Sequence, residues 1–236
     1  MHKIALSDAV INRIIERRGT LHPLKSLISN QTAHIVVDLQ NGFMAQGQPA
    51  EIAEAREIVP NVNRISQAVR AAGGLVVFLL NTFDADALAG WSTYFDLFSN
   101  PARKERMVAA FTPGSFGHDL WSGLDVQKGD LKLRKRRFGA FVQGSSDLHE
   151  ILQSRGIDTL IITGTATNVC CESTARDAMM LNYKVAFIAD GCATFNDAEH
   201  NATLDILAYA FADVMSTDEC LVLLAAAPAI TRQAAE

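Results

Sequence analysis

The sequence T-L-I-I-T-G-T-A-T-N-V-C-C-E-S-T, residues 159–174, determines how the rest of the chain can be interpreted. Its first five residues are apolar or β-branched and predict a buried strand. Gly164 and the small polar residues after it predict a turn, and a helix is expected over about residues 170–181. A buried strand that leads through a short turn into a helix is typical of a parallel sheet covered by helices.

The same alternation runs through most of the chain. Further strands are predicted over residues 34–38, 75–80, 130–138, 184–189 and 212–216, and helices over residues 57–72, 147–155, 198–211 and 217–227. Asp147 and Glu150 are expected to cap the second of these helices as a pair. The pattern predicts an α/β fold of three layers, α/β/α, around a central, mostly parallel sheet. Residues 81–129 interrupt it with many aromatic side chains, which can pack in the core or line a pocket.

Composition excludes several classes of protein. The chain has 236 residues, 49% of them apolar and 20% charged, which fits one large domain. Its net charge of −5 gives no basic field to recruit nucleic acid or an anionic membrane, and its apolar runs are too short to span a bilayer. No apolar signal core begins the sequence, so we expect a cytoplasmic protein with reduced cysteines.

Residues 1–28 are expected to form a helical extension before a main domain at residues 29–230. Ile4, Ile11, Ile14 and Ile15 recur there at helical spacing among charged residues, which predicts an amphipathic helix. Its apolar face must cover another surface, either on its own subunit or on a second copy of the chain. We expect a homo-oligomer that this extension helps to hold together.

Candidate functional residues lie just after the predicted strands, because ligands of parallel α/β sheets bind beyond the carboxyl ends of the strands. These residues are Asp38, Asn81, Lys135, Asp190 and the turn T-A-T-N-V-C-C at residues 165–171. Asp190 is expected to be structural, capping the turn that follows it.

The adjacent cysteines Cys170 and Cys171 point in different directions if a helix begins near Val169, since successive helical residues are about 100° apart. Steps of three and four residues from Cys171 reach Ala175 and Ala178, an apolar face, so Cys171 is expected in the core. Cys170 then faces the open end of the sheet. There the positive end of the helix favours a thiolate, although a simply buried Cys170 remains an equal alternative.

A cysteine nucleophile needs a base, and none of the six histidines follows a predicted strand. Asp38 is better placed, although it can also be a helix cap. The basic segment K-L-R-K-R-R resembles a nucleic-acid patch at first, but strand alternation puts Lys135 on the side of Leu131 and Leu133. Lys135 can therefore reach inward and keep Asp38 ionised.

Three segments together resemble the isochorismatase-like cysteine hydrolases over about residues 30–225. They are H-I-V-V-D-L-Q-N-G-F, L-R-K-R-R-F-G-A-F and I-I-T-G-T-A-T-N-V-C-C-E-S-T-A-R-D-A. The resemblance implies a three-layer fold of Rossmann-like topology and an assembly of two or four copies. It also implies an Asp38–Lys135–Cys170 triad and a cis peptide between Thr165 and Ala166. An oxyanion hole made by the N–H groups of Ala166 and Cys170 would follow.

Within that family the motifs look closest to ureidoacrylate amidohydrolases, with Cys171 where valine is usual and R-R-F-G-A-F where P-R-Y-S-G-F is usual. The expected substrate is a small linear amide or a ureido or carbamoyl compound, with an N-carbamoyl amino acid as the alternative. Neither a cofactor nor a metal is expected, because N-T-F-D-A-D-A-L lacks the histidines of the nicotinamidase branch. Isochorismatases proper lack the cysteine.

Four residues are candidates for substrate binding: Gln40, Asn41, Asn81 and Arg137. Asn41 can equally be a turn residue, and Arg137, which could meet a substrate carboxylate, can equally be an exposed strand-end arginine. Two other classes of protein remain open. One is a redox sensor that uses the Cys170–Cys171 pair, and the other is a binding protein without catalysis.

Overall fold

A six-stranded parallel sheet forms the centre of the protein in a computed structural model that describes residues 1–226. Its order is β3-β2-β1-β4-β5-β6, and every neighbouring pair is parallel. The strands are β1 (Thr32–Val37), β2 (Leu75–Asn81), β3 (Leu131–Lys135), β4 (Thr159–Thr165), β5 (Lys184–Ala193) and β6 (Asp213–Met215). The predicted α/β class is confirmed, and the sheet is parallel throughout.

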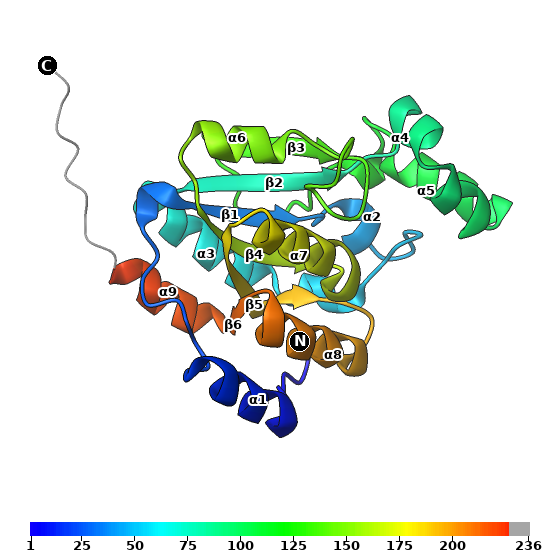
Figure 1. Cartoon of the computed structure of the whole chain (residues 1–236). Coiled ribbons are helices and arrows are strands. Elements are labelled where there is room, and N and C mark those ends of the chain that lie inside the picture. The colour runs from blue at the N-terminus through cyan, green and yellow to red at the C-terminus, as the bar shows by residue number, and fades with distance from the viewer. Residues whose placement is uncertain (227–236) are drawn as a thin grey trace, which may run out of the picture.

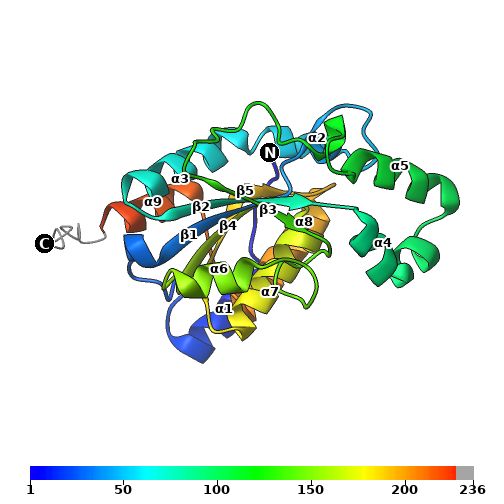
Figure 2. The ribbon, with the colours of Figure 1, turned by 90° about the horizontal axis from the view of Figure 1, so that it is seen from above.

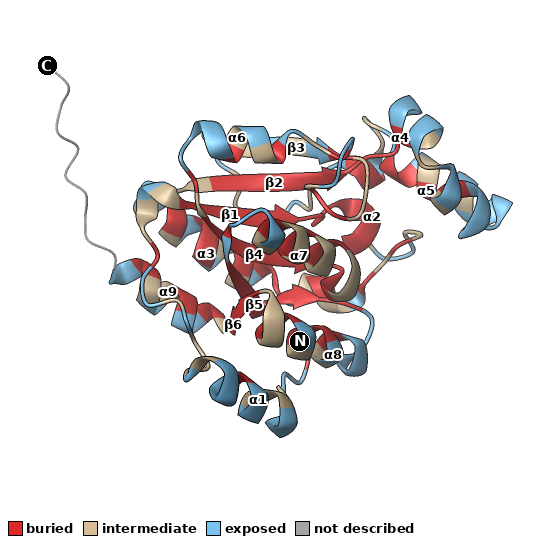
Figure 3. Ribbon diagram, viewed as in Figure 1, coloured by how far each residue is buried: buried red, intermediate tan, exposed pale blue. Residues whose placement is uncertain are grey.

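Helices cover both faces of this sheet (Figures 1 and 2). On one face lie α3 (Val59–Ala71) and α9 (Thr217–Ala225), whose apolar side chains share a core cluster with Val36 and Phe78. On the other lie α1 (Asp8–Arg18), α6 (Leu148–Ser154), α7 (Glu172–Met180) and α8 (Asp197–Ala210). The strands between these layers are almost entirely buried, except the edge strand β3 (Figure 3).

The strand order creates a position where a ligand can bind. The chain builds β1, β2 and β3 outward in one direction, then returns to place β4 on the other side of β1. At such a switch point the connections that leave β1 and β4 diverge and open a crevice beyond their carboxyl ends. Asp38 follows β1 directly, and the cysteine-bearing turn follows β4.

The aromatic insert between β2 and β3 forms a separate small core beside this crevice. It contains α4 (Ala85–Gly90), a π-helical turn (Thr93–Leu97), α5 (Pro101–Phe111) and a 3-10 turn (Phe116–His118). Helices α4 and α5 project from the carboxyl end of the sheet near the short α2 (Asn41–Met44) (Figure 1). Phe83, Phe95 and Phe111 are buried against one another. Part of the insert is therefore core packing, as one of the two alternatives predicted.

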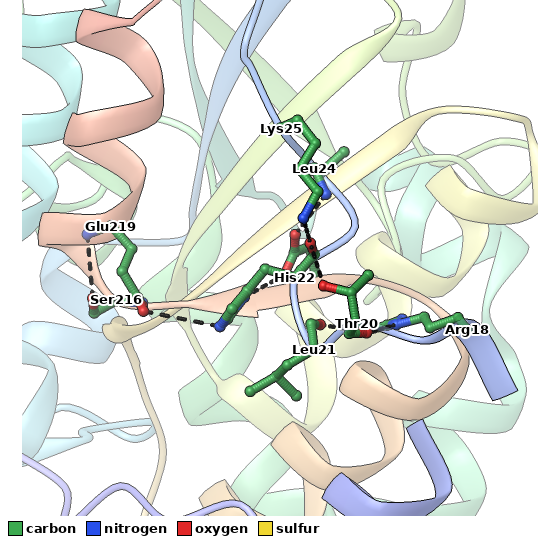
Figure 4. Close-up of polar contacts among 9 residues, drawn as sticks. Arg18, Thr20, Leu21, His22, Leu24, Lys25, Ser216 and Glu219 are labelled. Atoms are coloured by element: carbon green, nitrogen blue, oxygen red, sulfur yellow. Dashed lines mark hydrogen bonds and ion pairs between the residues drawn. The ribbon is translucent and has the colours of Figure 1, made fainter. Parts of the chain in front are cut away.

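The N-terminal extension packs on its own subunit. Ile14 of α1 is fully buried in the core cluster that includes Leu204 and Leu207 of α8. Asp213, at the start of β6, accepts hydrogen bonds from the ring of His22 (2.8 Å) and the backbone N–H of Leu24 (2.9 Å). Figure 4 shows the segment around His22 folded against the start of α9. The predicted oligomer and the division at residue 28 stay predictions, and the expected end at residue 230 lies outside the described residues.

Two local expectations differ from the structure. Asp147 precedes α6, but its side chain makes no capping hydrogen bond, so the predicted capping pair is wrong. The regular helix after β4 begins at Glu172, because Thr167–Cys171 forms a wider π-helical turn. The described part of the chain contains no helix with the length and apolar character needed to cross a membrane.

Candidate active site

A buried ion pair joins the ends of two strands. Lys135, the last residue of β3, places its Nζ 2.8 Å from Oδ2 of Asp38, and both side chains are fully buried. Nζ also donates to the carbonyl oxygen of Arg137 (3.0 Å). Asp38 has a left-handed backbone (φ 55°), and its N–H donates to the carbonyl of Leu79 on β2 (3.2 Å). The alternation of β3 thus predicted correctly that Lys135 points inward.

The charges of this pair depend on each other. Burial raises the pKa of Asp38 above its ordinary value, while the Lys135 ammonium opposes that rise. Burial acts against the charge of Lys135 too, but Asp38 and Cys170 together raise its pKa above its ordinary value. Lys135 is therefore a cation at neutral pH, and Asp38 is a stronger base than an exposed carboxylate.

Cys170 lies beside this ion pair at the wall of a cavity, with 4% of its surface exposed. Burial raises the pKa of its thiol to about 12, with Lys135 opposing and Asp38 adding to the rise. This is contrary to the expectation of a thiolate at the helix end: burial is the largest cause of the raised pKa, and the regular helix begins only at Glu172. Cys171 is fully buried with Ala175 and Ala178, as the helical spacing predicted.

The turn that carries Cys170, residues Thr167–Cys171, is called here the nucleophile turn. It begins after a cis peptide between Thr165 and Ala166, and the Ala166 carbonyl accepts the N–H groups of Val169 and Cys171 (both 3.1 Å). Gly164, just before it, has φ 124°, and a Cβ there would lie 2.1 Å from the carbonyl oxygen of Val37. Glycine is required because β4 passes so close to the end of β1.

A cavity of about 260 Å³ opens in front of Cys170. Aromatic and aliphatic side chains dominate its wall: Phe43, Pro49, Ala50, Ile52, Phe83, Tyr94, Phe98, Met107, Phe138, Ala166, Val169 and Phe195. The polar side chains in the wall are Asn81, Glu51 and Arg103. Glu51 is paired with Arg56 (2.9 Å), whereas Arg103 has no acidic partner within 4 Å among residues 1–226. The cavity therefore suits a small and mainly apolar molecule with one anionic group.

Three of the four predicted substrate-binding residues lie outside the cavity wall. Gln40 is fully buried and binds the backbone carbonyls of Asn81 (3.2 Å) and His118 (2.9 Å), so its amide holds the insert in place. The amide of Asn41 donates to the carbonyl of Phe116 (2.9 Å), which supports the alternative of a turn residue. Arg137 donates to the carbonyl of Gly90 (2.6 Å). All three side chains therefore already donate hydrogen bonds to backbone carbonyls of the protein.

Asn81 does line the cavity, and so does Tyr94, one of the aromatic residues of the insert for which a pocket lining was one of two predicted roles. Arg103 also lines the cavity but was missed by the sequence reasoning, although the insert that carries it was the available signal. Asp190 has a structural role, but the predicted cap of a following turn is wrong, because β5 continues to Ala193. Its Oδ1 instead accepts the N–H and hydroxyl of Thr217 (2.7 and 2.8 Å) at the start of α9.

The geometry bears on two other kinds of site, an oxidant-sensing cysteine pair and a metal site. All four cysteines are free and buried. Burial raises the pKa of the Cys171 thiol, and that of Cys170 is raised too, which is the opposite of what an oxidant-sensing thiol needs. In the described part of the chain, no group of three or more histidine, cysteine or acidic side chains is arranged to hold a metal ion.

Comparison with known proteins identifies relatives of this chain. Residues 32–219 match the isochorismatase domain. The uncharacterized isochorismatase family protein YwoC of Bacillus subtilis is 34% identical over 193 residues, covering 81% of this chain and 93% of that protein. Ureidoacrylate amidohydrolase RutB of Serratia proteamaculans is 35% identical over 172 residues, 68% of each chain. A probable inactive nicotinamidase of Arabidopsis thaliana is 32% identical over 175 residues, 73% of this chain and 86% of that one.

Solved structures agree with the sequence relatives. The crystal structure of a cysteine hydrolase from Pseudomonas syringae has a TM-score of 0.76 and 26% identity, covering 87% of this chain and 97% of that one. An isochorismatase family protein from Desulfovibrio vulgaris has a TM-score of 0.70 and 25% identity, covering 83% and 98%. The chain is therefore a member of the isochorismatase family of cysteine hydrolases.

Proposed function

We propose that this protein is a cysteine-dependent amidohydrolase that cleaves the C–N bond of a small linear amide, with a ureido or carbamoyl compound as the substrate class. One observation carries the proposal: Cys170 lies between a substrate-sized cavity and the buried Asp38–Lys135 pair. A thiol that is protonated at rest needs a base close to it, and the influence of the Asp38 carboxylate on the pKa of Cys170 supports Asp38 in that role.

In the proposed reaction, Asp38 accepts the thiol proton as Sγ of Cys170 forms a bond to the carbonyl carbon. The N–H groups of Ala166 and Cys170 bind the oxyanion. Asp38 then returns the proton to the nitrogen as the C–N bond breaks, and an amine or ammonia leaves. Water next attacks the thioester or S-carbamoyl intermediate, with Asp38 as base, and the Cys170 thiol is regenerated.

The pKa values support coupled transfer of the proton. With a thiol pKa of about 12, free thiolate is rare at neutral pH, so the proton must move while the C–S bond forms. The raised pKa of Asp38 narrows the difference in pKa between the Cys170 thiol, which is the acid, and Asp38, which is the base. Lys135 opposes that rise, which favours the ionised form of Asp38.

The cavity and the relatives support the substrate class. Its volume of about 260 Å³ is below that of most drug-sized sites, which favours a compact substrate. RutB proteins at 33–36% identity are named ureidoacrylate amidohydrolases. Arg103, at the cavity wall, is suited to bind a carboxylate at the far end of such a molecule. An N-carbamoyl amino acid also carries a carboxylate and is the second candidate substrate.

The test is ammonia release from a panel of ureido acids, N-carbamoyl amino acids and simple amides by the wild type and Cys170→Ser. We expect turnover of at least one ureido or carbamoyl acid by the wild type and none by the variant. Equal release by the two proteins would refute a cysteine mechanism. Absence of turnover across the panel, with a folded wild type, would refute the amidohydrolase proposal.

A further inference from the structure

The first seven residues lie as an extended N-terminal strap (residues 1–7) along α8. Backbone N–H groups of Lys3, Ala5 and Ser7 donate to side-chain oxygens of Asp197 (3.3 Å), Asn201 (3.0 Å) and Asp205 (2.9 Å). The donors on the strap are two residues apart and the acceptors on α8 are four residues apart. These spacings match, because two extended residues advance by about 6.6 Å and four helical residues by about 6 Å. The amide of Asn201 also donates to the carbonyl of Lys3 (2.9 Å). The strap is thus fixed in register.

His2 is the buried anchor of this strap. The backbone N–H of Thr194 donates to its Nε2 (3.1 Å), so that nitrogen carries no hydrogen. Its Nδ1 must then be the protonated nitrogen, and it donates to Asp197 (2.8 Å). The ring stacks on the ring of His200, with centroids 4.4 Å apart. Register and anchor together hold His2 in one orientation.

Two chains of contacts lead from His2 to the nucleophile turn. Through the first, His2 stacks on His200, whose Nδ1 is 2.9 Å from the hydroxyl of Thr167, the first residue of that turn. Through the second, His2 binds the N–H of Thr194, whose hydroxyl donates to the side chain of Asn168 (2.7 Å). Burial lowers the pKa of His200 to about 4, so its ring is neutral at physiological pH.

We infer that His2 is a positioning residue, which holds the nucleophile turn through His200 and Thr194 so that Cys170 faces the substrate. The inference rests on the proposed function for what the turn does. His2 is neither a residue of the cavity wall nor a member of the Asp38–Lys135 pair. Because the turn carries both Cys170 and its N–H group, a small displacement would weaken attack and oxyanion binding together.

The test compares the full-length wild type with His2→Leu, which keeps a side chain of similar size without ring or nitrogens. Lys3→Ala is the matched control, because it leaves the strap backbone intact next to His2. We expect His2→Leu to lower kcat roughly tenfold with KM changed less than about twofold. We also expect hydrogen exchange in a peptide spanning residues 166–171 to become roughly fivefold faster, the effect of losing one hydrogen bond.

A double-mutant cycle checks the route. If His2 acts through the Thr167 contact, His2→Leu combined with Thr167→Val lowers kcat by less than the product of the single effects. Values of kcat and exchange for His2→Leu that equal those of Lys3→Ala would overturn the inference, whatever happens to the melting temperature. Hydrogen exchange needs no substrate, so it decides the inference even if no amide is hydrolysed and the proposed function fails.

Discussion

Replacing Lys135 with methionine tests the proposed base most directly. At 2.8 Å, the attraction between Nζ of Lys135 and the Asp38 carboxylate is roughly 6 kcal/mol at an effective dielectric constant of about 20. Without it, the pKa of Asp38 rises further above its ordinary value, because burial is no longer opposed. A protonated Asp38 cannot accept the thiol proton. Since general base catalysis contributes about 10²–10⁴-fold, we expect kcat at neutral pH to fall by a factor in that range.

Stability should change much less than turnover. An unpaired buried charge costs about 3–5 kcal/mol, but Asp38 can avoid that cost by taking up a proton, and methionine fills the space left by the lysine stem. The free energy of unfolding of Lys135→Met, measured by denaturant titration, should therefore fall by less than that amount.

The assay is kcat measured across pH for the wild type, Lys135→Met, Lys135→Arg and Lys132→Met. Lys132 lies on the same strand, but its side chain is on the exposed face, so it is the matched control. Activity requires ionised Asp38, so a higher pKa moves the acidic limb of the profile to higher pH. Lys135→Arg should recover only part of the activity, because a planar guanidinium does not replace a compact ammonium. Turnover like that of Lys132→Met, with an unmoved acidic limb, would refute the role of Lys135.

Four further predictions follow from the site and the extension. Cys170→Ser should lose turnover and stay folded while Cys171→Val keeps most of it, and labelling by an electrophile mapped mainly to Cys171 would reverse that assignment. Arg103→Ala should raise KM for carboxylate-bearing substrates roughly tenfold or more while neutral amides are unaffected, with Lys104→Ala as control. Activity should survive dialysis against a chelator, and its loss with recovery on adding zinc or manganese would contradict this. A chain starting at Ser29 should assemble into fewer copies than the full chain, and an unchanged number of copies in sedimentation would rule out the extension as a necessary clasp.

Strand periodicity was sufficient to predict the parts of the site that depend on one element. Alternation along β3 put Lys135 on the inner face, and the helical spacing after β4 separated core Cys171 from Cys170. Asp38 was found because it directly follows a buried strand. In each case one local period determines which way a side chain points, and the sheet then brings the strand ends together.

Features that depend on packing between distant segments could not be read in this way. The raised pKa of Cys170 comes mainly from burial, which depends on tertiary packing and cannot be read from the helical spacing around the cysteine. Gln40 and Arg137 follow strands, but their side chains bind backbone carbonyls of the insert, whose course no periodicity predicts. Arg103 reaches the cavity only because α5 folds back toward the sheet end.

The buried Asp38–Lys135 pair is better explained by chemistry than by stability. Moving two charges out of water costs several kcal/mol per ion, and well-packed apolar residues in such positions are often equally or more stabilising. Yet the pair is fully buried and joins the ends of β1 and β3 beside Cys170. Burial raises the proton affinity of Asp38, while Lys135 opposes that rise and favours the charged carboxylate. In the proposed mechanism, the same desolvation that makes the site costly to fold therefore supplies the base that a protonated thiol requires.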